Sequence, residues 1–143
     1  STSVEYNNST TVEERGDKDM KVIKRLPESE LEIMQIIWKE PAPVSRILIE
    51  ERLQQEHPLA PTTILTLLTR LCEKSFLKMK KEGRTNYYYP VITEKEYLAS
   101  ESRSFLDRLF QGSVANFAAA LNDGGVKKEE LEELRQLLEK GEL

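Results

Sequence analysis

Residues 61–90 read PTTILTLLTRLCEKSFLKMKKEGRTNYYYP, and this stretch decides the fold. Apolar residues in its first half recur at i, i+3, i+4 and i+7, the spacing of an amphipathic helix. Pro61 suits the first helical position, because its missing N–H needs no partner there. We therefore predict a helix from Pro61 to Lys74. Its apolar stripe consists of Ile64, Leu67, Leu68 and Leu71.

The opposite side of this predicted helix is rich in threonine. Threonine is a poor helix former, so four threonines in eight residues weaken the helix without adding to the core. One interpretation is a face that is merely solvated, and the other is a face that enters a DNA groove. The segment that follows favours the second. The outward positions are Thr62, Thr63, Leu65, Thr66, Thr69 and Arg70.

A basic hairpin is predicted directly after the helix. Residues 77–82 alternate with a strand period, Gly83 can adopt the positive φ of a tight turn, and residues 85–89 are rich in β-formers before Pro90. Residues 60–90 hold six bases and two acids, a net charge of +4 in a chain of net charge −4. Such an island is typical of a phosphate-contacting surface. The bases are Arg70, Lys74, Lys78, Lys80, Lys81 and Arg84.

Two further helices are predicted upstream. Apolar periodicity indicates one from about Glu28 to Lys39, and Ser45 is a good N-cap for a second that ends near Glu56. Prolines break the chain between them, and Val44 can pair as an edge strand. Three helices followed by a hairpin is the order of a winged helix, whose third helix reads the DNA major groove. We therefore predict a winged helix over residues 26–91.

The C-terminal third predicts a different kind of domain. Thr93 to Glu96 form a capping box that starts a helix to about Phe110, and two shorter amphipathic helices follow around residues 114–121 and 131–138. From Val91 onward there are eleven acids and seven bases, so this part does not favour DNA. Three short helices make a thin core, and pairing with a second copy would bury it. The alternative is packing onto the same chain's winged helix. We favour a dimerisation domain over residues 92–143.

Composition excludes several other classes of protein. One cysteine, Cys72, and one histidine, His57, cannot build a metal cluster, and no intramolecular disulfide can form. No nucleophile motif or phosphate loop is present, so we expect neither an enzyme nor a cofactor. No apolar run is long enough to span a membrane and no signal peptide is visible, so we expect a cytoplasmic protein. Residues 1–25 are polar and aperiodic, which predicts a disordered tail.

Several motifs, in their order and spacing, resemble the penicillinase-repressor (BlaI/MecI-type) transcriptional regulators from about Leu26 to Leu138. The resemblance implies a mostly α-helical homodimer, with an N-terminal winged helix and a three-helix C-terminal dimerisation domain. It also implies repression through a palindromic double-stranded DNA operator. The matching residues are 30–34 (ELEIM), Ile37-Trp38, 63–71 (TILTLLTRL), Gly83-Arg84, 88–90 (YYP), 94–97 (EKEY), Phe105-Leu106, 110–113 (FQGS) and 129–134 (EELEEL).

The resemblance places the DNA contacts on the helix and the hairpin described above. It implies that Thr62, Thr63, Thr66 and Arg70 face DNA, and that basic residues of the hairpin hold its backbone. Relatives often carry a basic residue where this chain has Thr62 or Leu65, which leaves operator sequence and affinity open. Lys80, Lys81 and Arg84 are the hairpin positions that it implies, and Lys74, Lys78, Leu65 and Thr69 complete the predicted surface.

Two further questions follow from the resemblance. Relatives paired with a membrane sensor protease are cleaved at a bond equivalent to Ser104-Phe105, but close relatives have Asn-Phe there. Cleavage at this bond and a packing role for Phe105 both stay open, and we favour packing. The Cys-x-Cys pairs of the copper-responsive relatives are missing. A winged helix that binds an acidic protein partner in place of DNA remains the alternative function.

Overall fold

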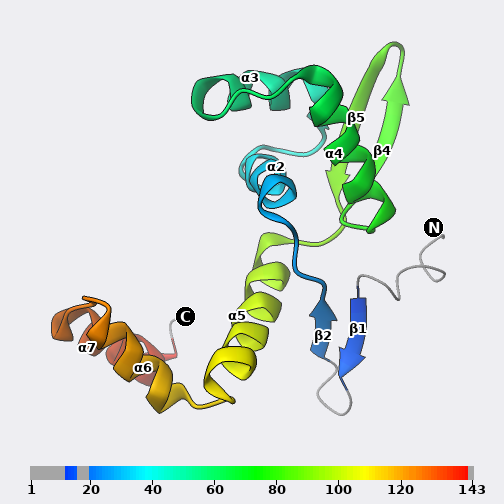
Figure 1. Cartoon of the computed structure of the whole chain (residues 1–143). Coiled ribbons are helices and arrows are strands. Elements are labelled where there is room, and N and C mark those ends of the chain that lie inside the picture. Colours follow the sequence, from blue (N-terminus) through cyan, green and yellow to red (C-terminus); the bar gives the residue numbers. More distant parts are fainter. Residues whose placement is uncertain (1–11, 16–19, 142–143) are drawn as a thin grey trace. The chain divides into compact units, whose positions relative to one another are not determined.

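The computed structural model of the protein describes residues 12–15 and 20–141 (Figure 1). The chain divides into two compact units, the first ending at Glu101 and the second starting at Ser102. This division falls ten residues after the boundary at 91/92 that the sequence suggested, because the first part of α5 (Glu94–Phe110) packs with the first unit.

The first unit contains three helices and a small antiparallel sheet with the strand order β3-β5-β4. This arrangement matches the expected winged helix, and the predicted bounds of α2, α3 and the hairpin agree with the structure. Ser45 caps α3 as expected, since its hydroxyl accepts a hydrogen bond from Leu48 N–H at 3.1 Å. The elements are α2 (Glu28–Lys39), β3 (Val44–Ser45), α3 (Arg46–Glu56), α4 (Pro61–Glu73), β4 (Leu77–Glu82) and β5 (Thr85–Pro90).

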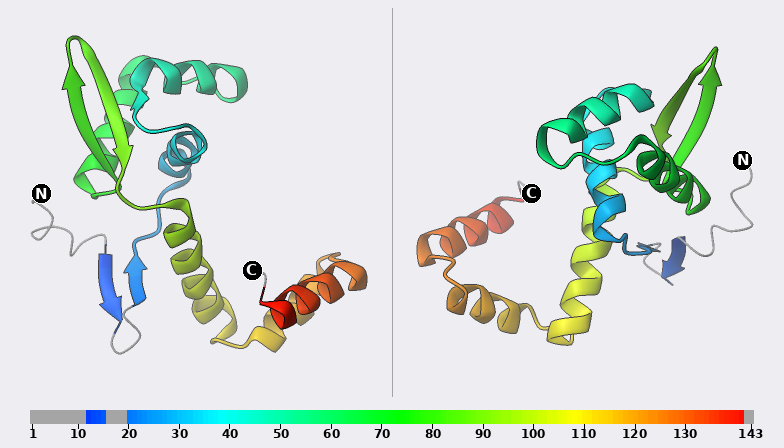
Figure 2. Two further views of the ribbon diagram at one scale, coloured as in Figure 1. Left: turned by 180° about the vertical axis from the view of Figure 1, so that it is seen from behind. Right: turned by 45° about the horizontal axis from the view of Figure 1, so that its top comes forward.

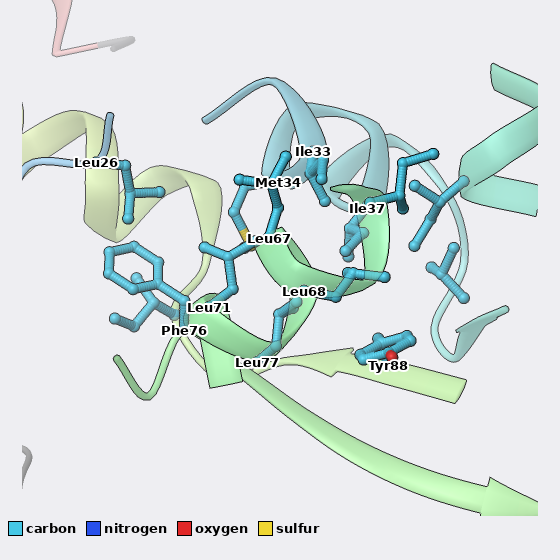
Figure 3. Packing of buried hydrophobic residues seen from close by; sticks show 14 of the residues in the cluster. Leu26, Ile33, Met34, Ile37, Leu67, Leu68, Leu71, Phe76, Leu77 and Tyr88 are labelled. Atoms are coloured by element: carbon cyan, nitrogen blue, oxygen red, sulfur yellow. The ribbon is translucent and has the colours of Figure 1, made fainter. Parts of the chain in front are cut away.

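The hydrophobic core of this unit lies between α2, α4 and the base of the hairpin (Figure 3). The apolar stripe predicted for α4 is buried along its whole length. Phe76 follows α4 directly and is fully buried in the same cluster. Close packing of these side chains fixes the position of α4, because its inner face cannot turn outward without exposing them. The residues labelled in Figure 3 are Leu26, Ile33, Met34, Ile37, Leu67, Leu68, Leu71, Phe76, Leu77 and Tyr88.

The N-terminal segment differs from the sequence-based expectation. Residues 1–25 were expected to be a disordered tail, but β1 (Val12–Arg15) and β2 (Met20–Ile23) form an antiparallel pair. Ile23 is also 95% buried and belongs to the core. The prediction followed the polar composition of this segment and gave too little weight to the β-formers near Ile23. Strand pairing and the burial of Ile23 hold them in place. The rest of the expected tail, residues 1–11 and 16–19, lies outside the described residues.

The second unit holds the end of α5, then α6 (Val114–Asp123) and α7 (Lys128–Lys140). Its centre is a cluster of three phenylalanines whose ring centroids lie 5.4–5.9 Å apart. None of the described residues of α6 and α7 is buried. The three helices thus have apolar faces that a single copy of the unit does not cover. The clustered rings are those of Phe105, Phe110 and Phe117.

Candidate nucleic-acid interface

The outer face of α4 consists of the residues that the sequence predicted. Burying the apolar stripe orients the helix, so the opposite face is exposed to solvent. Its only charged residues are Arg70 and Glu73 near its C-terminal end, and Leu65 is 41% exposed among the threonines. An exposed helix face of small polar residues is narrow enough to enter a major groove. The exposed residues are Thr62, Thr63, Leu65, Thr66, Thr69 and Arg70.

Two of the threonine hydroxyls are already engaged. Thr66 Oγ1 donates a hydrogen bond to the carbonyl oxygen of Thr62 at 3.0 Å, and Thr69 Oγ1 donates to that of Leu65 at 2.9 Å. Each hydroxyl therefore donates its only hydrogen to a backbone carbonyl of the helix. It can accept a hydrogen bond from a ligand but cannot donate one. The remaining outward chemistry of these two side chains is an acceptor lone pair and a methyl group.

The start of α4 offers backbone donors. Ala60 precedes the helix and gives it no side-chain cap in the described structure. The first intrahelical bond is donated by Ile64 N–H to the Ala60 carbonyl at 3.0 Å, so the N–H groups of Thr62 and Thr63 come before the helical ladder. Both residues are exposed. These two N–H groups can bind an anion such as a DNA phosphate.

The hairpin presents its cations away from the helices. Its tip projects beyond α4 in all three views of Figures 1 and 2. A two-residue turn joins the strands, with Gly83 at φ +64°, as the sequence predicted. Within the described residues, the four hairpin cations form a single ion pair, a loose one of 3.9 Å between Lys80 and Glu82. Since both partners are exposed, water screens it. The exposed cations are Lys78, Lys80, Lys81 and Arg84.

Aromatic side chains accompany two of these lysines. Lys78 pairs across the hairpin with Tyr89, and Lys80 pairs with Tyr87. Cross-strand partners lie on the same face of the sheet, so lysines and tyrosines share one surface of the wing. A groove of 380 Å³ borders this surface, and Val91 is among the residues that line it. The surface combines positive charge with flat apolar area, which suits a sugar-phosphate backbone.

Lys74 differs from the other predicted cations. Its Nζ lies 2.5 Å from Oε1 of Glu30, whose side chain is 2% exposed. The lysine therefore balances a charge inside the protein, and its own side chain is only 33% exposed. The sequence could not show this, because 44 residues separate the two partners.

Arg46 was not among the predicted site residues. It is the first residue of α3, and the preceding residue, Ser45, pairs with Tyr87 of the wing. Arg46 thus follows the short strand β3 at the edge of the sheet, and its positive charge acts against the rise that burial causes in the pKa of Tyr88. Its guanidinium forms an ion pair with Glu50. Its position directly after an N-cap was the one sequence feature that could have pointed to it.

Other kinds of site find no support in the described residues. Residues 12–15 and 20–141 include no group of three or more potential metal ligands of the His, Cys, Asp and Glu types. Burial, helped by the charge of Glu73, raises the pKa of Cys72 to about 11, so its thiol is unreactive near neutral pH. Over the same residues, no helix has the length and apolar character required to cross a bilayer.

The bond between Ser104 and Phe105 lies inside α5. Ser104 is exposed and Phe105 is half-buried. The Phe105 ring contacts both Phe110 and Phe117, with centroids 5.9 and 5.8 Å away. Phe105 thus takes part in the packing of this cluster of rings. A protease would need to unwind this turn of the helix before it could cleave the bond.

Comparison with known proteins identifies the family. The penicillinase repressor family model matches residues 26–140. The penicillinase repressor of Bacillus licheniformis is 39% identical over 124 residues, which cover 84% of this chain and 94% of that protein. The methicillin resistance regulatory protein MecI of Mammaliicoccus sciuri is 33% identical, over 78% of this chain and 91% of its own.

A solved structure also resembles about half of this chain. It is the solution structure of monomeric Bacillus licheniformis BlaI in complex with the blaP half-operator. It is 35% identical, covers 52% of this chain and 89% of its own, and has a TM-score of 0.45. The family model extends beyond this region over most of the sequence, and the relatives named above match over most of their length. The chain therefore belongs to the penicillinase repressor family of DNA-binding transcriptional repressors.

Proposed function

We propose that this repressor binds a palindromic DNA operator as a homodimer, with α4 of each protomer in the major groove and the wing on the flanking backbone. One observation carries the proposal. The exposed face of α4 carries only Arg70 and Glu73 as charged residues, both near its C-terminal end, whereas four exposed cations lie together on the adjacent hairpin. Such a separation suits a protein that reads bases with the helix and holds phosphates with the wing.

The residues of α4 have separate roles in this proposal. The N–H groups of Thr62 and Thr63 bind a phosphate at the start of the helix, and Arg70 anchors a phosphate or a guanine at its other end. Thr66 and Thr69 turn methyl groups and acceptor oxygens to the base edges, because their hydroxyl hydrogens are held by the helix backbone. Such a surface suits thymine methyl groups and the amino groups of adenine or cytosine.

The wing and the start of α3 supply affinity that does not depend on base sequence. Lys80, Lys81 and Arg84 lie at or near the tip of the hairpin and are exposed. Each cation that neutralises a phosphate releases a counterion and makes binding more sensitive to salt. Lys78 adds to this surface, and Arg46 extends it at the edge of the sheet.

The second unit supports the homodimer. Several large apolar side chains on its helices remain more than 40% exposed in a single copy of the chain. A second copy offers the same apolar faces, so a two-fold interface can cover both sets at once. In such a dimer, binding of one DNA-binding unit to its half-site raises the effective concentration of the other unit at the second half-site. The exposed residues are Leu109, Val114, Leu134 and Leu138.

Two parts of the proposal concern the setting in which the repressor works. Because it acts on DNA, we place it in the cytoplasm. Release of the operator by a membrane sensor protease that cuts Ser104-Phe105 remains a proposal. The exposed Ser104 and the boundary between the two units two residues earlier support it. The packing of the Phe105 ring weighs against ready cleavage.

A DNA-binding assay separates this proposal from the alternative of a protein-interaction module. Labelled DNA from upstream of the repressor's own gene is titrated with the full chain at about 150 mM salt, against shuffled DNA of equal length. A repressor should prefer the upstream fragment by roughly a thousandfold or more. Equal affinity for both DNAs would contradict sequence-specific binding and favour an acidic protein partner for the wing.

A further inference from the structure

The backbone of Ile23–Leu26 is held by two side chains of α5. Ser100 Oγ accepts a hydrogen bond from Ile23 N–H at 2.8 Å and lies 3.3 Å from the Ile23 carbonyl oxygen, to which it can donate. The Tyr97 hydroxyl accepts a hydrogen bond from Leu26 N–H at 2.9 Å. Ser100 and Tyr97 are three residues apart and so lie on one face of the helix. We call this set of contacts the α5 clasp.

The α5 clasp is buried and tied to the core. Tyr97 is 2% exposed and Ser100 is 6% exposed, so an unmade hydrogen bond would leave a buried polar group without a partner. The Tyr97 ring also contacts Phe76, with the centroids 5.8 Å apart, and Phe76 directly follows the end of α4. In Figures 1 and 2, β2 and the chain after it lie beside the first half of α5.

A second contact fixes the beginning of α5. Trp38 Nε1 donates a hydrogen bond to the Ile92 carbonyl at 2.9 Å, and its ring lies 5.7 Å from that of Tyr97. The helix is therefore attached to α2, to Phe76 and to the N-terminal segment before it leaves the first unit at Glu101. Without the clasp, the turn that holds Ser100 keeps only a loose contact to the N-terminal segment among the described residues, an ion pair of 3.7 Å between Arg25 Nε and Glu101 Oε2, which solvent screens.

We propose that Ser100 and Tyr97 are positioning residues that set the direction in which α5 leaves the DNA-binding unit, and with it the half-site spacing that the dimer accepts. The inference rests on the proposed homodimer and palindromic operator. Since α5 is the covalent link between the two units, its direction relative to α4 limits which half-site spacings the DNA-binding unit of the second protomer can reach. Neither residue lies on the exposed face of α4 or on the wing. Part of the clasp, Ile23, precedes the region that the family model matches.

The test uses the full-length chain with the double substitution Tyr97→Phe and Ser100→Ala. Tyr97→Phe keeps the ring and removes only the hydroxyl, and Ser100→Ala removes only the other hydroxyl. Ser102→Ala is the matched control, because Ser102 is an exposed serine two residues further along α5. Affinity is measured for a half-site duplex, for the palindrome, and for palindromes with one or two base pairs inserted or deleted at the centre. Thermal unfolding and half-site binding report whether the variant is folded.

The inference requires a specific split between these measurements. The double variant should bind the half-site as the unmodified protein does, bind the palindrome about tenfold more weakly, and lose much of its preference for one spacing. Equal losses on half-site and palindrome would show a general structural role and overturn the inference. An unchanged spacing preference would overturn it as well. If the unmodified protein binds half-site and palindrome equally, the proposed homodimeric reading fails first, and the inference fails with it.

Discussion

Lys74 Nζ lies 2.5 Å from Glu30 Oε1 and so joins the end of α4 to the first turn of α2. The carboxylate is buried and the lysine is one third exposed. This pair holds the C-terminal end of the reading helix against the core, at the opposite end from Thr62. It also removes one positive charge from the surface that the basic island seemed to offer. A cation that looks like a DNA contact in the sequence is a structural one here.

The first prediction concerns that pair. Lys74→Met should lower the free energy of unfolding by about 3 kcal/mol, because it leaves the Glu30 carboxylate buried and unpaired. Replacing both partners by Lys74→Met with Glu30→Leu should cost less than the single substitution. Urea unfolding measures both. The control is Lys78→Met at an exposed position, which should change stability by less than about 0.5 kcal/mol. An equal effect of the two lysine substitutions would refute the structural role.

The second prediction separates the hydroxyl of Thr66 from its methyl group. Thr66→Val keeps the shape and a methyl group and removes only the acceptor oxygen, so it should bind a half-site about twofold more weakly than the original protein does. Thr66→Ser keeps the hydroxyl and should bind roughly fourfold more weakly, since one methyl contact is lost. Fluorescence anisotropy on a half-site duplex measures both. The opposite order would mean that the hydroxyl leaves the Thr62 carbonyl and bonds to DNA.

The third prediction concerns the salt dependence that the wing confers. Lys80→Gln and Lys81→Gln should each flatten the slope of log affinity against log salt on a half-site duplex by about one unit. Lys39→Gln is the control, because Lys39 is exposed on the α2–α3 side of the unit, where it borders a separate pocket. It should leave the slope unchanged. A uniform change for all three variants would indicate a general effect of charge and would argue against a wing contact.

The fourth prediction concerns the dimer. Leu138 is 60% exposed in the single chain and lies on the apolar face of α7. Leu138→Glu should leave each chain folded but make it monomeric at about 10 µM, since a buried unpaired carboxylate costs several kcal/mol. Gln136→Glu adds the same charge at an exposed polar position and should remain dimeric. Analytical ultracentrifugation measures the mass. If the Leu138→Glu variant remained dimeric, Leu138 would lie outside the dimer interface.

The fifth prediction follows from the pKa of Cys72. Burial raises this pKa from 9.0 to about 11, so at pH 8 the folded protein has about a hundredfold fewer thiolates than the unfolded chain. Labelling by a disulfide reagent should therefore be slow until urea unfolds the protein. Because the folded-state pKa is the higher one, the associated stability is present below pH 9 and is lost between pH 9 and 11. Rapid labelling at pH 8 without urea would contradict the buried environment.

The sequence predicted those elements whose causes are local. The helix bounds Glu28–Lys39 and the hairpin strands agree with the structure, because they depend on apolar spacing, caps and turn residues close together in the chain. The expected capping box of α5 is also present: Thr93 N–H donates to Glu96 Oε1 at 2.9 Å, and Glu96 N–H donates to Thr93 Oγ1 at 3.1 Å. The exposed row on α4 followed from the same periodicity. Its contacts with DNA, and the dimer, stay predictions.

Thus the sequence by itself determined a threonine-faced helix, a basic hairpin and their order in the chain, since each pattern spans only a few residues. Tertiary structure alone decided which of the basic residues remain free. It paired Lys74 with a carboxylate 44 positions away and joined Ile23 to Ser100 across 77 positions. Local periodicity carries no information about such partners, because their proximity depends on how all the elements pack into one core. The stretch from Pro61 to Pro90 is thus a reading surface with one fewer cation than its sequence suggests.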